Sequence, residues 1–382
     1  MKYTLNDFFK CADEKRISAH FNADKTLVGF KYTPETVYSQ NWNEIALLSR
    51  GIVFEVTTGK IVAFPFKKFF NFEELYESAS MNKTNFANTL PKDYLCDSFS
   101  GKFRVMEKYD GSLGIAFFYN GKWIVKTGGS FDSEQAIWAT DYLNTKCNTE
   151  CLNKDFTYCF EIICNEDVHP IHYDFEGLIL LGVIDTQTGI EQPIEVIRSY
   201  AAFGYMIAKE YEFGNFANVV KFAKKRDNIY EGVVVTFENG WKTKIKGEEF
   251  LKLQKLFHNI TKEAIWENFD YWNEIYKDFN FIMNIPEELK VMKEYAAELP
   301  KEFEEKRSRL LFISNTIAKM DVERKVAWEM ANEKTGNKTD AGIIMKMLEG
   351  NTSRYKEMIW KSLKPKKIEE NSNRLYGYEK FE

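Results

Sequence analysis

The stretch EGVVVTFENGWKTKIK, residues 231–246, has the pattern of two strands joined by a tight turn. Val233 to Val235 are β-branched, as strands favour, and Asn239-Gly240 is the strongest short-range signal of a β-hairpin. Similar short runs rich in Val, Ile, Phe and Tyr recur upstream, and a second Asn-Gly pair at 120–121 lies between two of them. The chain up to residue 247 is therefore predicted to form antiparallel sheets with some helices.

Three lysines and a glutamate gather on one face of this predicted hairpin. Side chains alternate along a strand, so the lysines of residues 242–246 point the same way. With a two-residue turn, Lys246 lies opposite Val233, and Glu231 lies diagonally beside it. A charged face of this kind is often only solvated. Lysines that pair with a buried strand need an anion, however, and a polyphosphate would serve.

From Glu248 onward the hydrophobic period becomes helical, as in the stripe formed by Phe250, Leu253 and Leu256. Breaks between the helices are predicted at four residues: Pro286, Pro300, Gly336 and Gly350. The predicted fold class is α+β, with one domain over residues 1–247 and an all-α domain over 248–382. The second domain contains many aromatic residues and lysines, which are expected in its core or on a surface that contacts a partner. They include Trp266, Tyr271, Trp272, Lys319, Lys346 and Trp360.

Length and composition narrow the protein class. The 382 residues are 44% hydrophobic and 16% aromatic, enough to bury sizeable cores in two domains. The chain has no run of about 18 apolar residues, so no membrane span is expected. The N-terminus lacks the apolar core of a signal peptide. Six cysteines without an export signal indicate reduced thiols in a cytoplasmic protein. A net charge of −5 argues against a uniformly basic surface but allows a local basic groove.

Several common sites lack their sequence fingerprints. The chain has no G-x-x-x-x-G-K-[ST] loop, no G-x-G-x-x-G and no protein-kinase H-R-D or D-F-G motif. Four cysteines and two histidines are candidates for a zinc site: Cys147, Cys151, Cys159, Cys164, His169 and His172. They include no paired C-x-x-C, so the cysteines are interpreted as packed thiols.

A second informative stretch is MEKYDGSLGI, residues 106–115. Lys108 stands between two acids and precedes a glycine and a predicted strand, so it is either part of a charged hairpin surface or a nucleophilic amine. Other charged residues also stand in apolar company, where burial is unfavourable without a partner: Arg50, Lys68 and Glu161.

Together these residues resemble the superfamily of ATP-dependent polynucleotide ligases and mRNA-capping guanylyltransferases. Lys108-Tyr109-Asp110-Gly111 matches its K-x-D-G nucleotidyl-acceptor motif. Three further stretches resemble its third, fourth and fifth motifs in order: Phe160-Glu161-Ile162, Glu231-Gly232-Val233-Val234 and Lys244-Ile245-Lys246.

Within that superfamily the chain looks most like the phage-type RNA ligase 1 family. The stretches Ser49 to Glu55, Lys68 to Asn71 and Ser130 to Ala136 carry this likeness, which covers most of residues 30 to 250. The resemblance implies a nucleotidyltransferase domain over 1–247 and a helical domain over 248–382 with a role in RNA or tRNA specificity.

The implied reaction has three steps and uses ATP with Mg²⁺ or Mn²⁺. Lys108 attacks ATP and becomes lysyl-AMP, AMP passes to an RNA 5′-phosphate, and a 3′-hydroxyl then displaces AMP to seal the strand. An attacking amine must be neutral, so neighbouring cations and the metal are expected to lower the pKa of Lys108.

The resemblance also implies individual roles. Arg50, Lys68 and Lys246 would contact phosphates, with Lys244 at the reacting α-phosphate, and Lys244, Lys246 and Glu231 would complete the catalytic set. Tyr32 and Phe70 would lie at the nucleotide, and Glu161 would hold the ribose. The metal or its waters would be held by three carboxylates: Asp110, Glu161 and Glu231. Where relatives can carry a basic residue, this chain has Thr127-Gly128, and Lys126 is expected to face the other side of its strand.

By resemblance the substrate would be RNA with 5′-phosphate and 3′-hydroxyl ends, such as a tRNA cleaved in its anticodon loop. End-healing would fall to a separate kinase and phosphatase, and no membrane partner is expected. Two alternatives stay open: a capping-type guanylyltransferase, and a catalytically idle RNA-binding module. Capping enzymes usually carry a second β-barrel domain, and the helical sequence after Lys246 argues against one.

Overall fold

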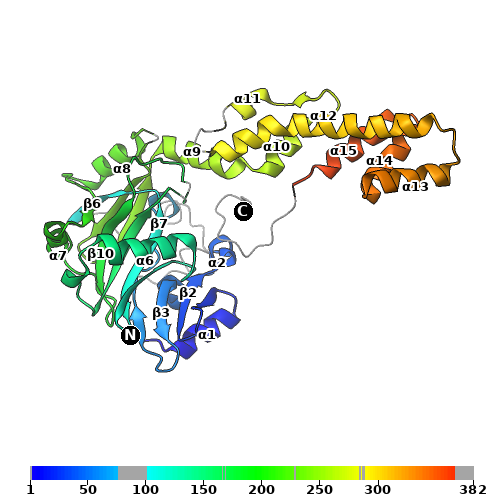
Figure 1. The fold of residues 1–382 in the computed structure, drawn as a ribbon. Coiled ribbons are helices and arrows are strands. Elements are labelled where there is room, and N and C mark those ends of the chain that lie inside the picture. Colours follow the sequence, from blue (N-terminus) through cyan, green and yellow to red (C-terminus); the bar gives the residue numbers. More distant parts are fainter. Residues whose placement is uncertain are drawn as a thin grey trace. The chain divides into compact units, whose positions relative to one another are not determined.

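The computed structural model describes residues 2–75 and 101–365, except 166, 168, 228, 284 and 286–288 and the side chains of 256–258 and 290. The chain divides into two compact units, Met1–Leu253 and Gln254–Glu382, shown in Figure 1. The predicted boundary at residue 247 precedes α9 (Glu248–Asn259), within which the two units divide. In the part of the chain that is described, no helix is long and apolar enough to cross a membrane.

The first unit begins with an antiparallel four-stranded sheet: β1 (Ile17–Phe21), β2 (Leu27–Tyr32), β3 (Arg50–Glu55) and β4 (Ile61–Ala63). Three helices accompany it: α1 (Leu5–Asp13), α2 (Pro34–Ser39) and α3 (Glu44–Leu48). Phe8 of α1 packs against Phe30 and Phe54, with ring centroids 5.2 and 4.9 Å away. These buried rings fasten α1 to the sheet.

Two five-stranded sheets make up the rest of the sheet structure among the described residues of this unit. The first has the order β11-β10-β9-β7-β8, and its strands are β7 (Ser112–Tyr119), β8 (Lys122–Thr127), β9 (Phe156–Ile163), β10 (Gly177–Asp185) and β11 (Met206–Ile207). The second has the order β12-β6-β13-β14-β5, and its strands are β5 (Phe70–Asn71), β6 (Phe103–Lys108), β12 (Glu210–Tyr211), β13 (Gly232–Phe237) and β14 (Lys242–Lys246). The pairs β10–β11 and β14–β5 are parallel, and the other pairs are antiparallel as predicted.

Helices and short turns connect these strands: α6 (Glu134–Lys146), η2 (Thr149–Cys151), α7 (Ile194–Ser199), η3 (Tyr200–Phe203) and α8 (Phe216–Lys224). Helix α6 packs across β8 and β10 (Figure 1). On the other side, Ile115 and Phe117 of β7 join Leu27 and Val53 of the first sheet in one buried apolar cluster. The β7 sheet is therefore covered on both faces, which buries its strands.

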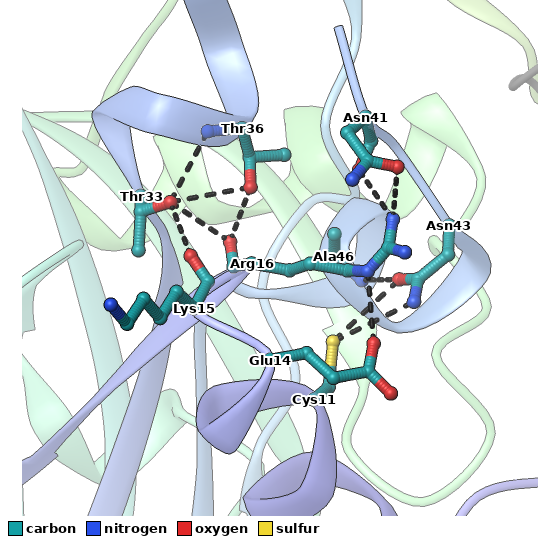
Figure 2. Close-up of polar contacts among 9 residues, drawn as sticks. All are labelled: Cys11, Glu14, Lys15, Arg16, Thr33, Thr36, Asn41, Asn43 and Ala46. Carbon is teal, nitrogen blue, oxygen red and sulfur yellow. Dashed lines mark hydrogen bonds and ion pairs between the residues drawn. The ribbon is translucent and has the colours of Figure 1, made fainter. Parts of the chain in front are cut away.

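A polar network holds the segment between Tyr32 and Arg50 in place (Figure 2). The Arg16 carbonyl accepts a hydrogen bond from Thr36 Oγ1 at 2.8 Å, and Arg16 Nη1 donates to Asn41 O at 2.9 Å. Asn43 Oδ1 accepts from Ala46 N at 2.8 Å and so caps α3. The turn after α1 is thereby tied to the segment that carries two predicted site residues at its ends.

The hairpin at Asn239-Gly240 forms, but the predicted register is wrong by one residue. Lys246 pairs with Gly232 rather than Val233. Phe237 N donates to Trp241 O at 2.8 Å, so the loop has three residues, 238–240, and Gly240 ends it at φ +82°. A glycine with positive φ after a turn favours this longer loop. By contrast, the Asn120-Gly121 pair forms the two-residue hairpin, with Tyr119 opposite Lys122.

The described residues of the second unit form helices and one short hairpin. Its elements are α10 (Lys262–Asn268), β15 (Phe269–Asp270), β16 (Ile275–Tyr276), α11 (Phe279–Met283), α12 (Lys290–Ala318), α13 (Arg324–Thr335), α14 (Lys338–Leu348) and α15 (Thr352–Ser362). Gly336 and Gly350 follow α13 and α14 with positive φ, as predicted for helix ends. The predicted break at Pro286 lies outside the described residues.

Pro300 does not break a helix, so this prediction is wrong. It lies inside α12. Proline lacks the N–H that would bind the carbonyl four residues earlier, that of Ala296. Tyr276 Oη donates to Ala296 O at 2.5 Å and replaces the missing donor. A side chain from the neighbouring hairpin therefore satisfies the carbonyl, which propensity within the helix does not reveal.

Candidate active site

Three neighbouring strands bring the predicted catalytic residues together. Lys108 ends β6, and both Lys108 and Lys246 pair with Gly232 of the central strand β13. Gly232 has φ +151°, and a Cβ there would lie 2.0 Å from Ile245 O. Only glycine fits this approach. Glu231, the residue before it, is thereby placed between the two lysines.

Glu231 bridges the two lysines. Its Oε2 lies 2.6 Å from Lys108 Nζ, and its Oε1 lies 3.0 Å from Lys246 Nζ. The carboxylate is 3% exposed, so these ion pairs are shielded from water. The prediction that Glu231 lies beside Lys246 is confirmed. The predicted hairpin register was wrong by one residue, but Glu231 reaches Lys246 from just outside the strand.

Lys108 is held as an ammonium in this arrangement. Burial lowers its pKa, but the carboxylates Glu231, Glu161 and Asp110 outweigh burial and raise the pKa above the ordinary lysine value. The expectation that nearby cations lower this pKa is therefore not met by the side chains alone. Lys244 shows the opposite balance: burial and the positive charges of Lys68 and Lys108 hold its pKa well below the ordinary value.

Cations and aromatic rings line the neighbouring part of the site. Strand β5 pairs with β14, with Asn71 opposite Lys244, so the segment ending in β5 lies beside the lysine strand. The ammonium of Lys68 lies 4.7 Å from the Phe70 ring and 5.5 Å from the Tyr32 ring. Burial and the nearby charge of Arg50 lower the pKa of Lys68 to about 8.

The predicted nucleotide residues therefore lie close to one another. Arg50 stacks on Phe69, with its guanidinium carbon 4.5 Å from the ring centroid, and its Nη1 is buried without a hydrogen-bond partner among the described residues. Phe70 is buried and packs on Trp42. A cluster of cations whose charges depress one another's pKa favours a polyanion.

Glu161 lies on β9, which pairs with β7 just after the Lys108 turn. The Gly111 N–H donates to Glu161 Oε1 at 3.1 Å, and a Cβ on Gly111 would lie 2.4 Å from Ile162 O. Burial raises the pKa of Glu161 to about 7, partly offset by the positive charge of Lys108. The turn after Lys108 therefore needs a glycine to approach β9 this closely.

This pKa predicts that Glu161 weakens the fold above neutral pH. The ordinary value is 4.5, so the native state binds the proton more tightly, and stability falls as pH rises from about 4.5 to about 7. Glu161→Gln should raise the free energy of unfolding at pH 8 by on the order of 2 to 3 kcal/mol, with a smaller gain at pH 5. Urea unfolding at both pH values measures this, with exposed Glu150→Gln as control. A Glu161→Gln protein less stable than wild type at pH 8 would contradict the assignment.

The contacts of Asp110 are with the segment of residues 169–173. Its Oδ2 accepts from Ile171 N at 3.2 Å, its Oδ1 lies 3.5 Å from His169 Nδ1, and its own N–H donates to Tyr173 Oη at 2.9 Å. Burial lowers the pKa of His169, but Asp110 and Asp167 outweigh it and raise the pKa to about 10. His169 entered the sequence analysis only as a zinc candidate, because no motif links it to Asp110.

The predicted metal ligands share the right chemistry but do not form one set. Carboxylate oxygens suit Mg²⁺ and Mn²⁺. Within the described ranges, no three His, Cys, Asp or Glu side chains converge as metal ligands. Asp110 turns toward His169, while Glu231 engages the two lysines. The assignment of Asp110, Glu161 and Glu231 to a metal stays a prediction.

Other residues considered from the sequence have structural partners. Lys242 shares the face of Lys244 and Lys246, but its ammonium lies 2.7 Å from Glu191 Oε2. Lys126 is buried against Gly29 and donates to Thr127 O at 2.6 Å, so it supports the loop at Thr127-Gly128. Burial raises the pKa of the Cys159 thiol to about 12, as expected for a packed thiol.

Comparisons with known proteins find RNA ligases similar to this chain. A family model described as RNA ligase matches residues 48–251, which is more than half of the chain. A Thermovibrio ammonificans protein named "Putative RNA ligase" is 25% identical over 290 residues, covering 73% of this chain and 66% of that protein. The RNA ligase of Rhodothermus phage RM378 is 24% identical over 278 residues, covering 58% and 63%.

The chain thus spans less than two thirds of the length of each of these relatives. A solved archaeal ATP-dependent RNA ligase is 14% identical with a TM-score of 0.44, covering 82% of this chain and 80% of that chain. The matched residues 48–251 contain Lys108, Glu161, Glu231, Lys244 and Lys246. The chain belongs to the RNA ligase family, the phage-type family that its motifs resemble.

Proposed function

We propose that this protein is an ATP-dependent RNA ligase that joins 5′-phosphate and 3′-hydroxyl RNA ends through a lysyl-AMP intermediate on Lys108. The observation that carries the proposal is the Glu231 carboxylate bridging Lys108 and Lys246 at 2.6 and 3.0 Å. A structural ion pair needs only one lysine. The second lysine, with Lys244 and Arg50 nearby, supplies charge for a polyphosphate.

Lys108 must lose a proton before it attacks. Glu231 Oε2 lies closer to Lys108 Nζ than its other acceptor, Tyr109 O at 3.3 Å, and so is the best placed group to take that proton. Phosphates that engage Lys246 would draw it from Glu231 and leave the carboxylate more basic. The Nζ–phosphorus bond then forms as the bond from the α-phosphorus to pyrophosphate breaks, and Lys244 stabilises the added charge.

The later steps reuse the same cations. An oxygen of the RNA 5′-phosphate attacks the phosphorus and breaks its bond to Lys108, which regains a proton. The 3′-hydroxyl then attacks the 5′-phosphorus, and AMP leaves. Asp110, Glu161 and Glu231 are the residues that would hold the divalent cation, which would neutralise phosphate charge when bound.

The direct test is incubation of the protein with radiolabelled ATP or GTP and a divalent cation. Label should pass to the protein from ATP and not from GTP, and chelation with EDTA should stop the reaction. Transfer from GTP would support a capping-type enzyme. No transfer from either nucleotide, with a folded protein and metal present, would support an idle RNA-binding module.

We further propose that the helical unit contributes to the choice of RNA, with a cleaved tRNA anticodon loop as the preferred substrate. Trp266 is 5% exposed and stacks on Trp360 with centroids 3.9 Å apart, so these rings belong to the core. Tyr271 stacks between Trp360, at 5.0 Å, and Trp272, at 5.8 Å, and Trp272 is 47% exposed. An exposed ring supported from behind is a surface on which an unpaired RNA base can stack.

Trp272→Ala should leave Lys108 adenylylation unchanged and reduce the preference for nicked tRNA over unstructured RNA by about tenfold, the scale of one lost base stack. Competition ligation with both RNAs in one tube measures the preference. Phe312→Ala is the matched control, because Phe312 is 74% exposed and lies on α12 of the same unit. An unchanged ratio in Trp272→Ala would place substrate selection elsewhere.

A further inference from the structure

The segment that follows Glu161 contacts the turn that follows Lys108. Three of its groups contact Asp110: the Ile171 N–H, Tyr173 Oη and the imidazole of His169. The segment connects β9, which carries Glu161, to β10. Asp110 therefore links the turn after β6 to the segment after β9, although β6 and β9 belong to different sheets.

His169 is the centre of this junction. Its Nδ1 lies 3.5 Å from Asp110 Oδ1, and its Nε2 lies 2.9 Å from Asp167 Oδ2. The three side chains are 10%, 9% and 6% exposed. Each ring nitrogen of His169 therefore faces a buried carboxylate. The ring keeps apart two acids that would otherwise repel each other in a site already rich in carboxylates.

Asp167 extends the contact to two more elements. Its Oδ2 accepts from Ser112 Oγ at 2.5 Å, and its Oδ1 accepts from Gln135 Nε2 at 3.1 Å. Ser112 begins β7, directly after the Lys108 turn, and Gln135 lies in the first turn of α6. A series of side-chain contacts, Asp110–His169–Asp167–Ser112, thus connects the two ends of the turn.

We propose that His169 is a positioning residue for the attack of Lys108 on ATP. It closes a loop of contacts around residues 110–112 and fixes the direction in which β6 presents Lys108. The inference rests on the proposed ligase function. Loss of the imidazole would let Asp110 turn toward Lys108 and move the turn, and a misplacement on the order of 1 Å can lower a rate about a hundredfold.

The test separates the lysine step from the sealing step. His169→Gln should lower the rate of Lys108 adenylylation at saturating ATP by about tenfold or more, with the KM for ATP changed by less than about threefold. Sealing of RNA that already carries a 5′-adenylate does not need Lys108 as nucleophile, so its rate should fall by less than about threefold. His172→Gln is the matched control, since His172 is exposed three positions away.

Equal losses in adenylylation and sealing would indicate a general structural role and overturn the proposal, and so would no loss in either. Asp167→Asn removes the charge on the other side of the imidazole, and it is judged by the same ratio of adenylylation loss to sealing loss. This second variant keeps the test decisive if circular dichroism shows that His169→Gln does not fold. Wild-type protein that forms no AMP adduct would refute the ligase proposal itself, whatever the variants do.

Discussion

Lys108→Ala should form no covalent AMP adduct and should seal no RNA that carries a 5′-phosphate. The side chain supplies the nitrogen that bonds to phosphorus, and no neighbouring group can replace it at the end of β6. Lys108→Arg should be equally inactive, because guanidinium stays protonated and is a poor nucleophile. Labelled ATP followed by denaturing electrophoresis measures the adduct, and ligation of 5′-labelled RNA measures sealing.

The matched control is Lys102→Ala, because Lys102 is exposed immediately before the same strand. It should adenylylate at the wild-type rate. An AMP adduct on either Lys108 variant would mean that another nucleophile accepts the nucleotide. Retained sealing of pre-adenylated RNA by Lys108→Ala, by contrast, is expected, since that step bypasses the lysine.

Glu231→Ala and Lys246→Ala should each lower the rate of adenylylation by about a hundredfold or more, as for other removed charge-stabilising groups. Removing Glu231 leaves the ammonium groups of Lys108 and Lys246 without their shared carboxylate and takes away the acceptor 2.6 Å from the nucleophile. Removing Lys246 takes away a phosphate contact. Single-turnover adenylylation at saturating ATP measures both losses.

Exposed Glu238→Gln, in the turn of the same hairpin, controls for changes to the hairpin itself and should stay active. Full activity of both Glu231→Ala and Lys246→Ala would make the bridging carboxylate a structural feature only. Thermal melting of each variant separates lost chemistry from lost folding.

The sequence was informative where a local pattern and a short turn determine geometry. Alternation placed Lys244 and Lys246 on one face, and the Asn-Gly pairs located both hairpins. The predicted register of the second hairpin was wrong because the same Asn-Gly pair can lie in a two-residue loop or in a three-residue loop. Glu231 still reached Lys246, because a glutamate side chain is long enough to absorb a shift of one residue.

Other features depend on contacts between distant residues, which a single sequence does not reveal. Pro300 lies inside a helix because Tyr276 supplies the missing donor. Lys242 has the same spacing as Lys244 and Lys246, but Glu191 pairs with it. The pKa of Lys108 is raised because Glu231 and Glu161, from two distant segments, add their charges to that of the neighbouring Asp110, whereas the motif alone suggested the effect of cations. His169 reaches Asp110 only after the segment following β9 folds back.

The central claim is that the amine of Lys108 carries AMP from ATP to RNA. It is tested most directly by mass spectrometry of peptides from protein treated with ATP and Mg²⁺, followed by a chase with 5′-phosphate RNA that lacks a 3′-hydroxyl. AMP should be found on Lys108 before the chase, and afterwards it should leave the protein and appear as a 5′-adenylate on the RNA. AMP on any other residue, or an adduct on Lys108 that the RNA does not remove, would contradict the account.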